Sequence, residues 1–214
     1  MRVFITGASG FIGTAVTKEL VEHGYEVFGM ARSDEGAELV RKAGGIVHRG
    51  TLEDLASIKS GADTADGVIH AAFNHDFSKV AENCEADRRA IEALGEVLAG
   101  SDRPLIVTAG VGHSMNGRPR TEQDAPMPAS PMLPRVSEQA AALVQANGVK
   151  SMVVRLPQVH DTQKQGLVTF AIELARQKGV AAYVGEGLNR WAAVHISDAA
   201  RLYRLVLEKG ESGL

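Results

Sequence analysis

The chain has 214 residues, of which 44% are hydrophobic and 23% are charged, and its formal net charge is -3. This length fits one large α/β domain, or a domain with a small appendage. The balanced charge, without a run of Lys or Arg, is not typical of a nucleic-acid partner, and no apolar stretch approaches the roughly 20 residues that span a bilayer. The first residues read as a strand and a turn rather than a signal peptide, so we expect a cytoplasmic protein without membrane attachment. The lone cysteine, Cys84, has a helical apolar spacing that favours a core thiol over a nucleophile.

Short apolar runs alternate with amphipathic segments along the chain. Six strands are expected, at Val3–Thr6, Glu26–Met30, Ile46–His48, Gly67–His70, Leu105–Thr108 and Ser151–Arg155. Helices are expected at Phe11–His23, Glu35–Ala43, Leu52–Lys59, Ser78–Ala99, Ser137–Ala146, Leu167–Lys178 and Asp198–Glu208. The third of these is expected to begin at a capping box formed by Thr51 and Asp54. This alternation predicts right-handed crossovers and an α/β fold with a doubly wound parallel sheet.

One segment, from Ala109 to Pro134, shows no periodicity and contains five of the seven prolines. Loops of this length are usually functional lids or disordered segments. Because it follows the fifth expected strand, it belongs to the carboxyl edge of the sheet, where open α/β folds bind ligands.

The strongest motif is a glycine trio, Gly7, Gly10 and Gly13, between the first strand and the first helix. Gly7 permits a tight turn, Gly10 lets a pyrophosphate approach the backbone, and Gly13 lets the helix pack close to the strand. The free amides at the helix start then face the phosphates. The position in the chain, at the first strand and before a suitable helix, favours a dinucleotide site over a glycine-rich turn without a ligand.

The end of the second expected strand decides which dinucleotide is bound. An acidic residue there would bond the ribose hydroxyls of NAD, but the sequence has Ala31 followed by Arg32 and Ser33. A guanidinium matches a 2′-phosphate in charge and geometry, so we expect NADP as the cofactor. NAD is the alternative, because Asp34 is close enough in sequence to reach the ribose and Arg32 can also be a plain surface arginine.

Several further segments resemble the extended short-chain dehydrogenase/reductase group, the NAD-dependent epimerase/dehydratase family, which has a Rossmann fold. The segments are the glycine motif, His48–Leu52, Val68–Ala72, Val154–Pro157, Gly185–Gly187 and Val194–Ala200. Thr51 stands where the family usually has an Asp. The resemblance implies a cofactor site made of Gly7, Ser9, Gly10, Phe11, Ile12, Arg32, Ser33, Thr51, Leu52, Ala71, Ala72 and Pro157.

The chain departs from this family at the catalytic residues. The family's reductases use a Tyr-x-x-x-Lys pair, in which the lysine lowers the pKa of the tyrosine. No such pair exists here: Arg135 stands in the Tyr position, Gln139 in the Lys position, and Gly110 near the usual Ser or Thr.

The catalytic residues are therefore unknown from sequence. Weak candidates to replace the usual ones are Thr108, His113, Ser114 and His160. Each has a structural alternative, as a strand-end threonine, as polar residues of a mobile loop, or as a packing histidine. No spacing of histidines and acids predicts a metal site.

The leading hypothesis is an NAD(P)-dependent oxidoreductase that transfers hydride to or from a small carbonyl or hydroxyl substrate without the usual Tyr. The alternatives are a dinucleotide-binding sensor or scaffold without chemistry, and an inactive fragment. We expect residues 1–160 to form the dinucleotide-binding domain. Residues 161–214 would complete the sheet and begin a reduced substrate region. The resemblance also implies a homodimer through the helices at 78–99 and 137–146, with a monomer as the alternative.

Overall fold

The computed structural model describes residues 1–112, 118–131 and 134–213. Within these residues six strands form one parallel sheet in the order β3-β2-β1-β4-β5-β6. The strands are β1 (Arg2–Thr6), β2 (Glu26–Ala31), β3 (Ile46–Arg49), β4 (Gly67–His70), β5 (Pro104–Gly110) and β6 (Lys150–Leu156). The order reverses between β1 and β4, which is the arrangement of a doubly wound fold and confirms the predicted fold class.

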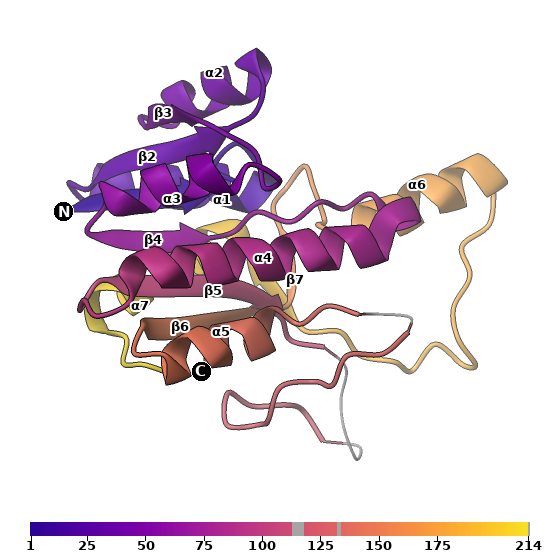
Figure 1. Cartoon of the computed structure of the whole chain (residues 1–214). Helices are drawn as coiled ribbons and strands as arrows, with labels where there is room; N and C mark the ends of the chain where they lie inside the picture. Colours follow the sequence, from indigo (N-terminus) through magenta and orange to yellow (C-terminus); the bar gives the residue numbers. More distant parts are fainter. Residues whose placement is uncertain (113–117, 132–133, 214) are drawn as a thin grey trace.

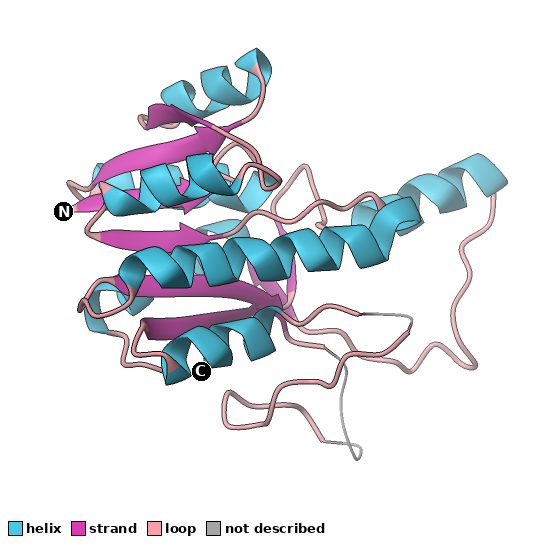
Figure 2. Ribbon diagram, viewed as in Figure 1, coloured by secondary structure: helices cyan, strands magenta, loops and turns pink. Residues whose placement is uncertain are grey.

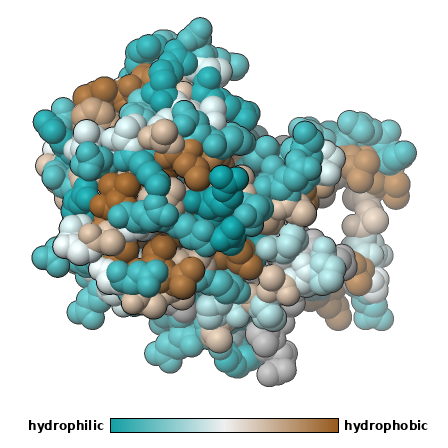
Figure 3. All heavy atoms as spheres, viewed as in Figure 1, coloured by the Kyte–Doolittle hydropathy of each residue, from teal (hydrophilic) through white to brown (hydrophobic). Residues whose placement is uncertain are grey.

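Helices cover both faces of the sheet (Figures 1 and 2). One face carries α3 (Leu55–Asp63), α4 (Val80–Leu98) and α5 (Ser137–Ala146), and the other carries α1 (Phe11–Glu22), α2 (Asp34–Lys42) and α7 (Ile196–Lys209). A single helix, α6 (Val168–Lys178), projects away from the sheet at the right of Figure 1. None of its described residues is buried, and apolar atoms gather on this projecting part in Figure 3.

The sheet separates two apolar cores. In β1, Val3 and Ile5 face the core beneath α1 and α7, whereas Phe4 faces the core beneath α3, α4 and α5. Successive side chains of a strand point to opposite faces, so a strand buried on both faces is apolar at every position. This is why the short apolar runs predict the strands correctly.

Three features differ from the sequence-based expectations. Helix α3 begins at Leu55, because the Asp54 carboxylate caps the amides of Ala56 and Ser57 at 3.1 and 3.2 Å. Thr51 instead accepts a hydrogen bond from the Asp54 amide at 3.3 Å, so the predicted capping box was misplaced by one turn. Two further strands, β7 (Gln158–His160) and β8 (Ala193–His195), pair with each other; three residues are too few to show a periodicity.

In the proline-rich segment between β5 and α5, residues 118–131 are held by hydrogen bonds from neighbouring elements. The Arg155 guanidinium, on β6, donates to the carbonyls of Thr121 and Asp124 at 3.1 and 2.7 Å. The Gln139 amide, on α5, donates to the Met127 carbonyl at 2.8 Å. Residues 118–131 are therefore held against the end of the sheet rather than free.

Candidate functional site

The turn after β1 has a geometry that requires glycine at two positions. Gly7 has φ +72°, and a Cβ there would lie 2.7 Å from the Cα of Ala72, which follows β4. A Cβ on Gly13 would lie 2.0 Å from the Gly7 carbonyl oxygen. The turn is thus packed directly against the end of β4 and against its own helix.

Gly10 differs from these two glycines because a side chain there would meet far fewer atoms. It precedes α1 with φ −79°, and its amide donates to the Gly7 carbonyl at 2.9 Å. Gly10 is exposed, and the Gly7 oxygen at 3.2 Å is the one heavy atom that a Cβ would meet within 4 Å among the described residues. The bare backbone at the start of α1, at the point where the strand order reverses, is the arrangement that accepts a pyrophosphate. The residues present fit a dinucleotide.

The carboxyl ends of β2 and β3 carry two arginines. Arg32 is exposed just after β2, and the Ser33 hydroxyl caps α2 by accepting from the Gly36 amide at 3.1 Å. Arg49, at the end of β3, pairs with the Asp34 carboxylate. Sequence reasoning identified Arg32 but did not assign Arg49 a role. The parallel pairing of Ala31 with Arg49 brings the second cation to the same edge.

Ala71 and Ala72 follow β4 and border the glycine turn. The Ala71 amide donates to the Thr6 carbonyl at 3.2 Å, and the Ala72 amide donates to the Thr6 hydroxyl at 3.3 Å. Leu52, by contrast, packs against the core beneath α3 and α4. The predicted cofactor residues therefore lie along the carboxyl edge, from β3 to the loop after β6 that contains Pro157.

A buried polar network crosses the molecule behind this edge. His70 contacts the Thr6 hydroxyl through Nδ1 at 2.8 Å and the Asp87 carboxylate through Nε2 at 3.1 Å. The Ser137 hydroxyl donates to the second Asp87 oxygen at 2.5 Å. Burial would raise the pKa of Asp87, but the bonds and charges of its partners, His70 first, keep it below its usual range. The fully buried carboxylate is therefore ionised, and it joins α4 to His70 of β4 and to Ser137 of α5.

Arg135, in the position of the family's tyrosine, is attached to this network. Its Nε donates to the Ser137 hydroxyl at 2.7 Å and lies 3.8 Å from Asp87, and its Nη2 donates to the Thr108 carbonyl at 3.0 Å. Its guanidinium lies 4.2 Å from the centroid of the Phe73 ring. The arginine is thus fixed near the ends of β4 and β5.

His75 is a second group in this region, and sequence reasoning missed it. It lies in the loop after β4, and its ring is 5.3 Å from that of Phe73. His75 is exposed as a whole residue, but partial desolvation of its ring, followed by the positive charges of Arg135 and Lys164, lowers its pKa below the ordinary value, and a hydrogen bond to the Phe73 backbone opposes this. No sequence signal marks His75, because the charges that act on it come from Arg135, just before α5, and from Lys164, in the loop after β7.

The four weak catalytic candidates meet different environments. The Thr108 hydroxyl bonds the fully buried Tyr203 hydroxyl at 2.6 Å, and burial raises the Tyr203 pKa above its ordinary value. His160 stacks edge-on against His195 with ring centroids 5.8 Å apart. His113 and Ser114 lie outside the described residues.

The lone cysteine, Cys84, is buried, and burial raises the pKa of its thiol, which favours the unreactive protonated form.

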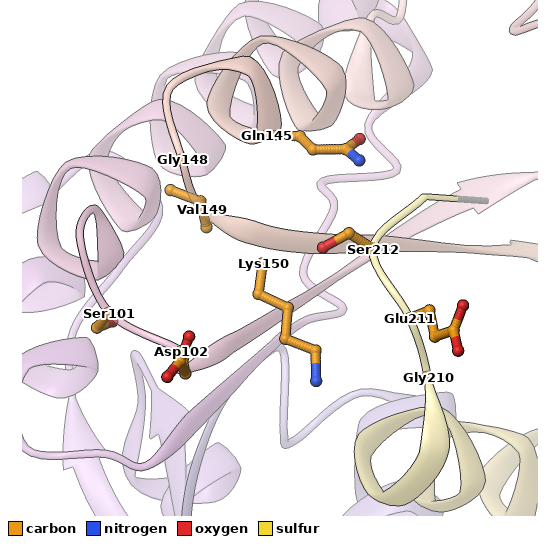
Figure 4. Close-up of a pocket in the computed structure, with 9 residues that line it drawn as sticks. All are labelled: Ser101, Asp102, Gln145, Gly148, Val149, Lys150, Gly210, Glu211 and Ser212. Atoms are coloured by element: carbon orange, nitrogen blue, oxygen red, sulfur yellow. The ribbon is translucent and has the colours of Figure 1, made fainter.

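A surface pocket lies at the opposite end of the sheet, near the starts of β5 and β6 (Figure 4). Its lining residues are Ser101, Asp102, Gln145, Gly148, Val149, Lys150, Gly210, Glu211 and Ser212. Doubly wound folds bind ligands at the carboxyl ends of their strands, so we do not place the functional site there.

Across the described part of the chain, no three or more His, Cys, Asp or Glu side chains are grouped to hold a metal ion. No helix in that part is both long and apolar enough to cross a membrane.

The fold and the glycine turn are those of the doubly wound class, whose members bind dinucleotides at this edge of the sheet. Residues 3–214 match the model of the NAD dependent epimerase/dehydratase family, and the chain belongs to this family. An uncharacterised protein of Schizosaccharomyces pombe is 46% identical over 216 residues, which cover all of this chain and 72% of that protein. The decarboxylating sterol-4-alpha-carboxylate 3-dehydrogenase of Dictyostelium discoideum is 26% identical, over 99% of this chain and 69% of that enzyme.

Solved structures agree on the fold. A UDP-glucose 4-epimerase from Thermotoga maritima superimposes with a TM-score of 0.77 and 21% identity, over 99% of this chain and 74% of that one. A dTDP-glucose 4,6-dehydratase from Bacillus anthracis, solved in complex with NAD, gives a TM-score of 0.77 and 16% identity, over 100% of this chain and 73% of that one. At these identities the likeness concerns the fold alone.

Proposed function

We propose that this chain is an NADP-dependent oxidoreductase that transfers a hydride between the nicotinamide and a small carbonyl or hydroxyl substrate. The observation that carries the proposal is the uncovered backbone at Gly10, at the start of α1 and at the reversal of the strand order. The relatives include a dehydrogenase and, at 28% identity, a ketoreductase of Stigmatella aurantiaca. When bound, the cofactor supplies or takes up the hydride.

Two arginines favour NADP over NAD. Arg32 is exposed at the end of β2, and Arg49 lies beside it at the end of β3. A guanidinium pairs with a phosphate through charge-assisted hydrogen bonds, whereas ribose hydroxyls are better matched by a carboxylate. Asp34, the nearest acid, is already paired with Arg49.

The proton must be exchanged by a group other than Arg135. Arginine stays protonated at every accessible pH, so Arg135 can bind negative charge but cannot act as an acid or a base. His75, whose ring lies 5.3 Å from that of Phe73 and whose pKa is lowered by burial and by the charge of Arg135, is a nearby group of the type that exchanges protons near neutral pH. We assign the proton exchange to His75.

The direction of the pKa shift sets the expected pH dependence. Because the pKa of His75 is below about 6.5, the imidazole is neutral at pH 7 and serves as a base for hydroxyl oxidation. Oxidation should then weaken as the pH falls through that lowered pKa. Carbonyl reduction, which needs the protonated form, should weaken as the pH rises through it.

The test is a screen of small carbonyl and hydroxyl compounds with NADPH or NADP⁺, followed by the pH profile of any activity found. His75→Asn should lower kcat by about 10²- to 10⁴-fold and abolish the limb of the profile assigned to it. His23→Asn, an exposed histidine at the end of α1, is the matched control and should leave both unchanged. An unchanged pH profile in His75→Asn would remove His75 from the mechanism.

A binding role without chemistry is the second candidate. The Gln139 amide, in the position of the family's lysine, is committed to the Met127 carbonyl and holds the long loop. A cofactor-bound protein whose loop regulates a partner would use the same contact. NADPH oxidation by the pure protein that depends on an added substrate would exclude this second candidate.

A further inference from the structure

Two cations at the carboxyl edge lie over phenylalanine rings. The Arg135 guanidinium is 4.2 Å from the Phe73 centroid, and the Lys164 ammonium is 5.2 Å from the Phe11 centroid. Phe73 follows β4 and Phe11 begins α1, so both cations flank the reversal point of the sheet. Both charges act on the same imidazole, that of His75. The carboxyl edge of the sheet therefore places the positive charges of Arg135 and Lys164 near the imidazole of His75.

Arg135 is held so that one edge of its guanidinium remains available. Nε and Nη2 are occupied by Ser137 and by the Thr108 carbonyl, and within the described chain we find no hydrogen bond from Nη1. The side chain is 23% exposed, so a ligand can reach it. An arginine fixed on two of its nitrogens presents the third to an anion at little entropic cost.

Two carboxylates near these cations, those of Asp87 and Asp161, already accept hydrogen bonds from other groups. Asp87 is fully buried and is shared by His70 and Ser137. The Asp161 carboxylate accepts the backbone amides of Gln163 and Lys164 at 2.7 and 2.6 Å, which fixes the turn that carries Lys164. Neither carboxylate therefore satisfies the Arg135 Nη1 edge or the Lys164 ammonium.

An aromatic strip leads outward from these cations. The ring centroids of His75 and Phe77 are 6.3 Å apart, and those of Phe77 and Phe170 are 6.2 Å apart. Phe77 and Phe170 are more than half exposed, at 59% and 55%. Exposed aromatic rings next to fixed cations suit a ligand with an anionic end and an apolar body.

We propose that this edge binds an organic carboxylate, with the carboxyl group held by Arg135 and Lys164 and the apolar body lying along Phe73, His75, Phe77 and Phe170. The proposal rests on the proposed function, because it names the substrate class of the same site. In this arrangement His75 lies between Phe73 and Phe77 in the aromatic strip along which the apolar body would lie.

The first experiment compares phenylacetate with its neutral analogue phenylacetamide, by calorimetry on the full chain with and without NADPH. Phenylacetate should bind at least about tenfold more tightly. Lys164→Met and Arg135→Met should each abolish this preference. Lys42→Met, an exposed lysine on α2, is the matched control and should retain it.

A second readout follows the His75 imidazole by NMR. Phenylacetate should raise the pKa of His75, because a bound carboxylate stabilises the imidazolium, and phenylacetamide should not. Lys164→Met leaves the buried network intact, so this variant tests the proposal even if Arg135→Met fails to fold.

The outcomes separate this proposal from the proposed function. Equal binding of acid and amide, with NADPH binding intact, would overturn the carboxylate site and leave the dinucleotide function in place. Loss of NADPH binding in Lys164→Met, with the preference for the acid retained, would assign Lys164 to the cofactor phosphates and also overturn the proposal. Failure of NADPH to bind the wild-type chain would instead contradict the proposed function.

Discussion

Gly10 and Gly13 belong to the same turn, but a side chain would clash with the backbone at Gly13 and would be nearly free of contacts at Gly10. A Cβ at Gly13 would overlap the Gly7 carbonyl, whereas a Cβ at Gly10 would point into free space except for one contact at 3.2 Å. The φ angle of Gly10, −79°, suits any residue. Gly13 is therefore required by packing, whereas packing does not require a glycine at position 10, which is consistent with the proposed approach of a ligand there.

This difference gives a test at the residue scale. Gly10→Ala should change the free energy of unfolding by less than about 1 kcal/mol, yet weaken NADPH binding by at least about tenfold. Gly13→Ala should cost more than about 3 kcal/mol, because the helix must move away from the turn. Urea denaturation and a fluorescence titration measure the two quantities. Tight NADPH binding by a well-folded Gly10→Ala variant would argue against a phosphate at this turn.

The conformation of the turn was predicted correctly from sequence because its signal is local: three glycines within seven residues, between a strand and a helix. The binding of a dinucleotide at this turn stays a prediction. The Asp87 network was not predicted, since Ser137 and Asp87 are separated by 50 positions in the chain and become neighbours in the fold. His75 was missed for the same reason. The assignment of Arg32 and Pro157 to the cofactor stays a prediction.

At the scale of elements, β6, α5 and the long loop are joined by one ion pair. The Arg155 guanidinium pairs with the Glu138 carboxylate at 2.7 Å, both side chains are 10% exposed, and Arg155 also holds two loop carbonyls. Periodicity identified the strand and the helix with boundaries accurate to one or two residues. It says nothing about the loop, whose position depends on contacts made by other elements.

Arg155→Met should release residues 118–131 while also destabilising the fold. The buried Glu138 carboxylate would lose its partner, at a cost of about 3 kcal/mol. Hydrogen exchange should accelerate in residues 118–131 more than in β1 or β4. Arg118→Met, which removes an exposed partner of Asp124, is the control and should cost less than about 1 kcal/mol. Unchanged exchange in the loop of Arg155→Met would show that the loop is held by something else.

At the scale of the whole molecule, the two apolar cores place every predicted cofactor residue on one edge of the sheet. α7 belongs to this unit, because its buried Tyr203 and Leu207 share a core with α1. The expected boundary at residue 160 and the expected homodimer stay predictions. The edge combines a glycine turn, two arginines at its β2–β3 end and a second cationic region at its β4–β5 end.

The central claim is that this edge binds NADP. The most direct measurement is a fluorescence titration of the wild-type chain with NADPH and with NADH, repeated on Arg32→Ala and on Arg201→Ala, an exposed arginine of α7, as the control. We predict that NADPH binds about 10- to 100-fold more tightly than NADH, that Arg32→Ala removes most of this preference, and that Arg201→Ala retains it. Absence of binding by either dinucleotide would contradict the account.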